Sequence, residues 1–211
     1  MSGREEKGHL RDMPVSLPPE KRVYAQSVDA LFVRALGPHL SRDGRRRLKD
    51  AGLDLGEPLR PSYALAQWKT FLRVAVEDVF PGLPEREAWS RLGERYLQGF
   101  RLTAQGRASM SLVTRLGPRH TLERVPHNVR AGNNFNEVRV EELGTHGARL
   151  WMRDVAADNP YFACGFLAET LRAAGAEDIQ VEPVSRDGTA ATFRLSWMNA
   201  STRPVASGSA R

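Results

Sequence analysis

Residues 127–142 read HNVRAGNNFNEVRVEE, and the pattern of the chain changes within them. Before this stretch, apolar residues recur every three or four positions, the period of a helix with one buried face. From Asn136 to Leu143 the pattern alternates, with Val138 and Val140 on one side and charged residues on the other, as in a half-buried strand. The stretch predicts the end of a helical part and the start of a sheet, with Gly132 or a neighbouring asparagine in the left-handed conformation that ends many helices.

The chain before this change is predicted to be mainly helical. Ser27 and Ser41 are the expected N-caps of two short helices, because a serine oxygen accepts hydrogen bonds from the free N–H groups of a first turn. Ser62 is expected to begin the most regular helix, whose apolar residues share one face: Leu65, Trp68, Leu72, Val76 and Val79. The predicted elements are a strand at 22–25 and helices at 28–36, 41–52, 62–80, 84–100, 102–116 and 119–130.

The chain after the change is predicted to form two hairpins with a helix between them. A turn at 144–147 joins the first pair of strands, and Asp187-Gly188 joins the second. Asn159-Pro160 introduces the helix, and Gly175 is expected to close it. The fold class is therefore α+β, with an N-terminal helical layer packed on a small four-stranded antiparallel sheet.

Length and composition favour one domain. The chain has 211 residues, of which 41% are hydrophobic, and we expect a single domain at 21–198 with flexible tails at 1–20 and 199–211. It contains no apolar run long enough to span a membrane, and its charged start, MSGREEKGHLRDMP, is unlike a secretory signal. The single cysteine, Cys164, excludes an intramolecular disulfide and a multi-cysteine zinc site. We therefore expect a cytoplasmic protein.

The net charge of +6 raises the question of nucleic-acid binding. Between Arg101 and Arg130 there are six arginines and one acid, Glu123, and a second basic group lies on one face of a short predicted helix. That group is Arg42, Arg45, Arg46 and Lys49. Aromatic, asparagine or glutamine side chains that read bases are missing beside them. We expect solvated basic faces and no nucleic-acid partner.

The usual catalytic and metal-binding patterns are missing from the sequence. The five histidines lack the HxxxH spacing of a metal site, and there is no G-x-S-x-G elbow or glycine-rich phosphate loop. Cys164 lies in an apolar helix, which favours a buried, inert thiol. We therefore predict no metal, no catalytic residue and a protein that is not an enzyme.

An interior ligand is the remaining candidate. Gly93, Gly99 and Gly106 lie within predicted helices, where each glycine costs about 1 kcal/mol relative to alanine, so either close helix contact or room for a ligand would compensate. The candidate ligand-binding residues are Trp68, Leu72, Trp89, Tyr96, Phe162 and Phe166. An ordinary aromatic core is the alternative for the same residues.

Five stretches together resemble a known family. They are RVYAQSVDALFVRALGP, AGLDLGEPLRPSYALAQW, VFPGLPEREAWSRLGERYLQGF, RLGPRHTLERVPHNVRAGNNF and AAGAEDIQVEPVSRDGTAATFRLSW. They are similar to a myxobacterial paralogous family that is described only as a domain of unknown function. The resemblance runs from about residue 22 to 197 and implies no particular reaction.

A more distant resemblance adds a fold. The order of elements, the glycines of WSRLGERYLQGF and the segment from Phe162 to Trp197 resemble the H-NOX haem sensors and the vinyl-4-reductase-type ligand domains, whose fold is shared with TRAPP vesicle-tethering subunits. This resemblance implies helices packed on a four-stranded antiparallel sheet, with a helix between two hairpins. It also implies a sensor of small molecules or, by way of the TRAPP relatives, an assembly protein.

The resemblance places a haem ligand near His127. The haem sensors hold the haem propionates with a Tyr-x-Ser-x-Arg motif, whereas this sequence has LWMRD at 150–154. Pro126 also precedes His127 directly and disturbs the helix that would aim the imidazole. The cysteine cluster of some vinyl-4-reductase-type domains is missing too. We therefore predict no resident cofactor, with His127 as the residue that haem binding would require.

Two functions follow from these expectations. The first is a non-enzymatic sensor or regulatory domain that binds a small, apolar ligand in the helical layer and signals through protein partners. The second is a scaffold or assembly protein that pairs with itself, as a dimer, or with another protein and needs no ligand.

Overall fold

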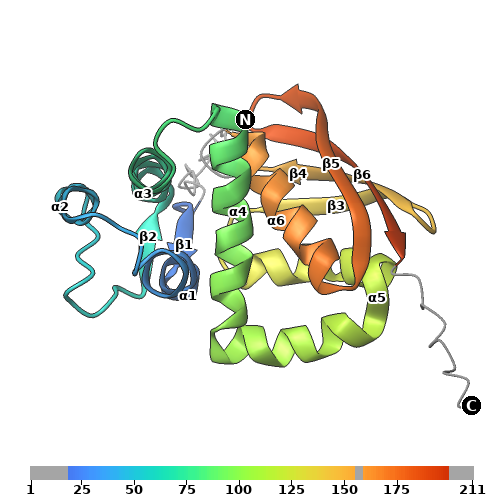
Figure 1. Ribbon diagram of the computed structural model, residues 1–211, viewed down its shortest axis with the longest axis horizontal. Helices are drawn as coiled ribbons and strands as arrows, with labels where there is room; N and C mark the ends of the chain where they lie inside the picture. The colour runs from blue at the N-terminus through green and yellow to red at the C-terminus, as the bar shows by residue number, and fades with distance from the viewer. Residues whose placement is uncertain (1–18, 155–158, 200–211) are drawn as a thin grey trace, which may run out of the picture.

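The computed structural model describes residues 19–154 and 159–199 and arranges them in two parts (Figure 1). The upright helix α4 stands between a group of helices with a small sheet on one side and a larger sheet, covered by α6, on the other. The elements are β1 Arg22–Tyr24, α1 Ala25–Val28, the π-helical turn η1 Asp29–Ala35, α2 Arg42–Asp50, β2 Ser62–Ala64, α3 Leu65–Val79, α4 Glu85–Arg101, α5 Ala104–Arg130, β3 Glu137–Leu143, β4 Gly147–Arg153, α6 Pro160–Ala173, β5 Ala176–Asp187 and β6 Ala190–Asn199.

The larger sheet confirms the predicted fold class. Its strands are all antiparallel, in the order β3-β4-β6-β5, and α6 follows the first hairpin and precedes the second. Alternate residues face α6 and are buried, because the side chains of a strand point to opposite faces in turn. They include Val138, Leu150, Met152, Phe193, Leu195 and Trp197.

One predicted serine cap and one predicted helix start are wrong. Ser27 lies inside the first helix, and Ser62, where a helix was expected to begin, belongs to β2, which pairs with β1. The small sheet supplies the caps instead: the N–H of Ala25 donates to the carbonyl of Pro61 at 3.0 Å, and the N–H of Leu65 donates to that of Lys21 at 2.9 Å. Because each helix start is satisfied by the backbone of the other strand, neither helix needs a side-chain cap.

Other predicted boundaries are confirmed. The Ser41 hydroxyl accepts from the N–H of Gly44 at 2.9 Å and caps α2, and the Asn159 side chain caps α6. Helix α5 bends sharply at Gly117, whose φ of 73° separates the two helices that the sequence predicted. Gly175 has a φ of +85° just after α6, in the left-handed conformation expected of a helix stop.

Glycines allow α4 to touch its neighbours directly. A Cβ on Gly93 would lie 2.0 Å from the carbonyl oxygen of Phe162, and one on Gly165 would lie 1.8 Å from that of Ser90. A Cβ on Gly99 would likewise meet the carbonyl of Ala30 at 1.8 Å. At these three positions, close contact between backbones compensates for the cost of placing a glycine within a helix. The glycines therefore leave no room there for a ligand.

The buried side chains form two separate cores. The helical layer contains an aromatic core, in which Phe32 makes edge contacts with Trp68 and Phe71. The second core lies between α6, the C-terminal half of α5 and the larger sheet, and it is mainly aliphatic, with Leu150, Leu167 and Trp197 buried in it. The space where the two cores meet is the place where an interior site can form.

Most residues of the predicted tails, 1–20 and 199–211, lie outside the described residues. Within the described ranges, no helix combines the length and the apolar character needed to cross a bilayer.

Candidate functional site

A cavity of about 110 Å³ lies where the helical layer, α6 and the start of the larger sheet meet. It is partly open to solvent, and its lining contains both aromatic and polar residues. The aromatic lining residues are Trp68, Tyr96, Phe100, Phe135, Phe162 and Phe166. The polar lining residues are Gln26, Ser27, Asn128, Asn133, Asn136 and Asp154.

The structure brings together four of the six residues predicted to bind a ligand. Trp68, Tyr96, Phe162 and Phe166 line the cavity, and the ring of Tyr96 lies 5.8 Å from that of Phe162 and 6.0 Å from that of Phe166. Leu72 and Trp89 do not line it and are buried in the helical core instead. The cavity therefore lies at the edge of the helical layer, against the sheet, rather than within that layer.

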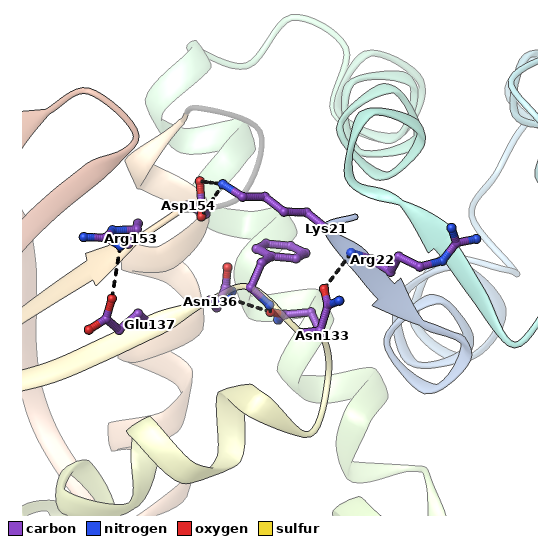
Figure 2. A network of polar contacts seen from close by, with 9 residues as sticks. Lys21, Arg22, Asn133, Asn136, Glu137, Arg153 and Asp154 are labelled. Carbon is purple, nitrogen blue, oxygen red and sulfur yellow. Dashed lines mark hydrogen bonds and ion pairs between the residues drawn. The ribbon is translucent and has the colours of Figure 1, made fainter. Parts of the chain in front are cut away.

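Asn133 and Asn134 organise the turn between α5 and β3 (Figure 2). The side-chain oxygen of Asn133 accepts from the N–H groups of Phe135 and Asn136, at 3.1 and 2.7 Å, which shapes the turn. The side chain of Asn134 reaches the N-terminal segment: it accepts from the N–H of Arg22 at 2.7 Å and donates to the carbonyl of Glu20 at 3.0 Å. The sequence predicted the turn, but only the structure shows that it holds β1.

The predicted left-handed residue at this helix end is wrong, because neither Gly132 nor the neighbouring asparagines have a positive φ. The carbonyl of Gly132 accepts from the N–H of Tyr24 at 2.9 Å and from the hydroxyl of Ser27 at 3.1 Å. A Cβ on Gly132 would lie 2.7 Å from the Ser27 oxygen. Glycine is therefore needed here for close approach of the first helix and not for a left-handed backbone.

Asp154 ends β4 at the rim of the cavity and was not predicted as a site residue. Its carboxylate accepts from the ammonium of Lys21 at 2.9 and 2.8 Å, and its side chain is 5% exposed whereas that of Lys21 is 49% exposed. Its φ of 54° is unusual for a residue other than glycine. Figure 2 shows Lys21 reaching across from the segment before β1 to the end of β4. The feature of the sequence that could have identified Asp154 is its position as a lone acid directly after a predicted strand.

The residues that line the cavity include a hydroxyl pair and one unpaired oxygen. The Ser27 and Tyr96 hydroxyls are 3.0 Å apart, and burial raises the pKa of Tyr96, which keeps the phenol protonated. The side-chain oxygen of Asn136 is buried and has no hydrogen-bond partner within the described part of the chain. Unpaired buried polar atoms are rare, because each costs the hydration that it has lost. Although Asn136 lines the cavity, this oxygen is closed off from it, so its missing hydrogen bond is a cost of the fold and not a position for a ligand.

The residues around the cavity do not fit haem. His127 is exposed and does not line the cavity, and among the lining residues that the structure describes there is no histidine, cysteine, lysine or arginine. Iron would thus lack a histidine or cysteine ligand, the Tyr96 hydroxyl is already bonded to Ser27, and the propionates would meet the Asp154 carboxylate instead of a cation. Binding sites for drug-sized molecules have volumes of about 300 to 1,000 Å³, well above that of this cavity, and haem is at least of that size.

Cys164 is buried in the sheet core, away from the cavity. Burial raises the pKa of its thiol to about 12, so the thiolate that a metal or an electrophile requires is scarce at neutral pH. In the ranges that the structure covers, no group of three or more histidine, cysteine, aspartate or glutamate side chains is arranged to hold a metal ion.

Comparisons with known proteins agree with this fold. The model of a family described as "Protein of unknown function (DUF2378)" matches residues 21–198. No curated protein matches the sequence.

Solved H-NOX structures have a similar fold. A variant of the Fe(II) unliganded H-NOX protein from K. algicida superposes with a TM-score of 0.60 at 12% identity, covering 82% of this chain and 96% of that one. The H-NOX protein from S. oneidensis in the Fe(II)NO ligation state has a TM-score of 0.56 at 12% identity, with 82% and 98% covered. At this identity the likeness shows the fold alone.

Proposed function

Since the chain belongs to the DUF2378 family of proteins of unknown function, we propose its role from its own cavity. The protein is a non-enzymatic sensor domain that binds a small molecule between the helical layer and the sheet and signals through protein partners. The observation that carries this proposal is the cavity itself, which lies where the two cores meet and is lined by residues from both.

The fold supports a sensor role. The similar structures are named as H-NOX proteins, and one of them is in an Fe(II)NO ligation state, so the architecture is known to hold a small ligand. The residues of this chain do not suit haem, which directs the proposal to a ligand bound by the cavity wall alone. A cavity of about 110 Å³ is of the same order as an engineered apolar cavity of about 150 Å³ that binds benzene.

The contacts around the cavity support a route for the signal. Hydrogen bonds and an ion pair hold β1 and the residue before it to the α5–β3 turn and to the residue after β4. They include the bonds of Tyr24 to the carbonyl of Gly132 and of Arg22 to Asn134, and the ion pair of Lys21 with Asp154. Gly132 and Asp154 also line the cavity. A ligand that shifts Gly132 or Asp154 therefore changes the contacts that hold the N-terminal segment. A ligand shifts the equilibrium between two conformations only if it interacts differently with each of them.

The hydroxyl groups of the wall support a binding role rather than a catalytic one. Ser27 and Tyr96 bond to each other and Ser27 also bonds to a backbone carbonyl, so neither pairs with a base that would activate it. Within the described part of the lining, Asp154 is the one carboxyl group, and it is already paired with Lys21.

Nuclear magnetic resonance with added benzyl alcohol tests the proposal. We expect chemical-shift changes at the Trp68 indole and slower hydrogen exchange at the Tyr24 amide, which reports on β1. Ala163→Leu places a larger side chain on the cavity wall and should abolish both changes, whereas the matched variant Ala108→Leu on the exposed face of α5 should leave them intact. Shifts spread over the surface and insensitive to Ala163→Leu would contradict the proposal.

A scaffold function is the second candidate, and an open sheet edge favours it. β5 is the longest strand, and in the described residues no strand pairs with its outer side. Free backbone groups on such an edge are a template for a strand of a second chain. Light scattering over a concentration series should then give a dimer, and a monomer at every concentration would exclude self-association by this edge.

A further inference from the structure

We propose that the cavity takes a small organic amine, which brings its ammonium group to Asp154 and its apolar body to the aromatic side chains of the lining. This inference rests on the proposed function and adds the chemical class of the ligand. The inference follows from the hydrogen bonds that the Asp154 carboxylate can still accept, from the charge of that carboxylate and from the aromatic side chains that line the cavity.

The hydroxyl groups of the wall are already paired. The hydroxyl of Ser27 donates its single hydrogen to the carbonyl of Gly132, so the hydroxyl of Tyr96 is the donor in the bond between Tyr96 and Ser27. The amide of Gln26 donates to Ala131. Among the lining residues that the structure describes, the Asp154 carboxylate is the charged acceptor, and a ligand that binds it must bring a donor.

The charge of the wall favours a cation. Of the lining residues in the described ranges, Asp154 is the single charged one. A carboxylate offers about four lone-pair positions, and Lys21 occupies one on each oxygen. Because the carboxylate is nearly buried, an anionic ligand would be repelled with little screening, whereas an ammonium group would gain charge-assisted hydrogen bonds.

The aromatic side chains of the lining suit the rest of such a molecule. Trp68, Tyr96, Phe162 and Phe166 present rings to the cavity, and ring faces attract ammonium groups as well as apolar bodies. The volume of about 110 Å³ limits the ligand to about one ring or a short branched chain.

Lys21 already occupies the position of the ammonium group. Its side chain is 49% exposed, so water can replace its contact at low cost, whereas Asp154 is nearly buried at the end of β4. Two ammonium groups on one carboxylate repel each other. The ligand and Lys21 therefore compete for Asp154, and binding releases the contact between the N-terminal segment and β4.

Calorimetric titration of the whole chain with four compounds of one size tests the inference. The compounds are benzylamine, benzyl alcohol, toluene and benzoate. We expect benzylamine to bind about tenfold more tightly than benzyl alcohol or toluene, since a charge-assisted hydrogen bond exceeds a neutral one by about that factor, and benzoate not to bind.

Two variants test which residues cause the preference for benzylamine. Asp154→Asn keeps the shape of the side chain and should remove the advantage of benzylamine while leaving benzyl alcohol nearly unchanged. Lys21→Met removes the competitor and should raise the affinity for benzylamine by about threefold or more, whereas the control Lys49→Met, at an exposed pair with Asp54, should not.

The outcomes separate the inference from the proposed function. Equal affinity for benzylamine and the neutral compounds would overturn the inference and leave the proposed function standing. Failure of all four compounds to bind would overturn both. The ranking of the compounds on the unmodified chain decides the inference even if a variant fails to fold.

Discussion

The helical layer and the sheet meet along two seams that are built differently. At the seam between α4 and α6, glycines bring backbones into contact, and the buried Glu169 pairs with Arg101 and Arg172. At the seam between β1 and the α5–β3 turn, polar side chains make the connections and a cavity remains. Two helix backbones in direct contact cannot change their contacts without moving apart, whereas polar side chains can exchange hydrogen-bond partners by rotating. The first seam therefore fixes the arrangement of the two parts, and the second can respond to a ligand.

The largest effect is expected at the glycine seam. Gly165→Ala puts a Cβ 1.8 Å from the carbonyl oxygen of Ser90, so α4 and α6 must separate. The free energy of unfolding, measured in urea, should fall by about 3 kcal/mol or more. Gly144→Ala is the control, because its Cβ would make an ordinary contact of 3.5 Å on an exposed turn. Similar losses in both variants would show that the seam is not special.

A smaller loss is expected at Gly132, on the polar seam. Gly132→Ala would place a Cβ 2.7 Å from the Ser27 oxygen, and the unfolding free energy should fall by about 1 to 2 kcal/mol. In a Ser27→Ala background this loss should shrink, because the oxygen that the Cβ meets is gone. A double-mutant cycle measures the difference, and additive losses would mean that Gly132 is required for another reason.

The ion pair at the rim should contribute about 1 to 2 kcal/mol. Lys21→Met leaves the nearly buried carboxylate of Asp154 without a partner, although water reaches the lysine side of the pair and limits the loss. Lys49→Met removes an exposed pair and should change the unfolding free energy by less than about 0.5 kcal/mol. If the two lysine variants are equally stable, the rim pair does not hold the seam.

The smallest effect is expected at His127. Its side chain is exposed and away from the cavity, so His127→Ala should change stability by less than about 0.5 kcal/mol. Haem titrated into the unmodified chain should produce no Soret band characteristic of ligation. A band that appears with the unmodified chain and is lost in His127→Ala would contradict the misfit between haem and this cavity.

Much of the fold was predictable because its signals are local. The change from helical period to alternation near Asn136 located the sheet, and the helix stops at Gly117 and Gly175 were identified from glycine and proline positions. The cap at Ser27 and the helix start at Ser62 were predicted wrongly, since a local rule cannot see that carbonyls just before β2 and β1 accept from the first N–H groups of the two helices. Of the aromatic residues of the candidate site, Trp68, Tyr96, Phe162 and Phe166 were predicted and Phe100 and Phe135 were not, and Leu72 shows that burial alone does not place a residue on the cavity.

By itself the sequence determined the order of the main elements apart from β2, the fold class and the turn at the asparagines, because periodicity and turn chemistry depend on residues a few positions apart. The tertiary structure alone decided where the space lies and which groups line it. Lys21 and Asp154 are 133 positions apart along the chain, and Ser27 and Gly132 are separated by 105. Contacts over such separations depend on how α4 packs against α6 and how β1 reaches the sheet, and no local pattern records either.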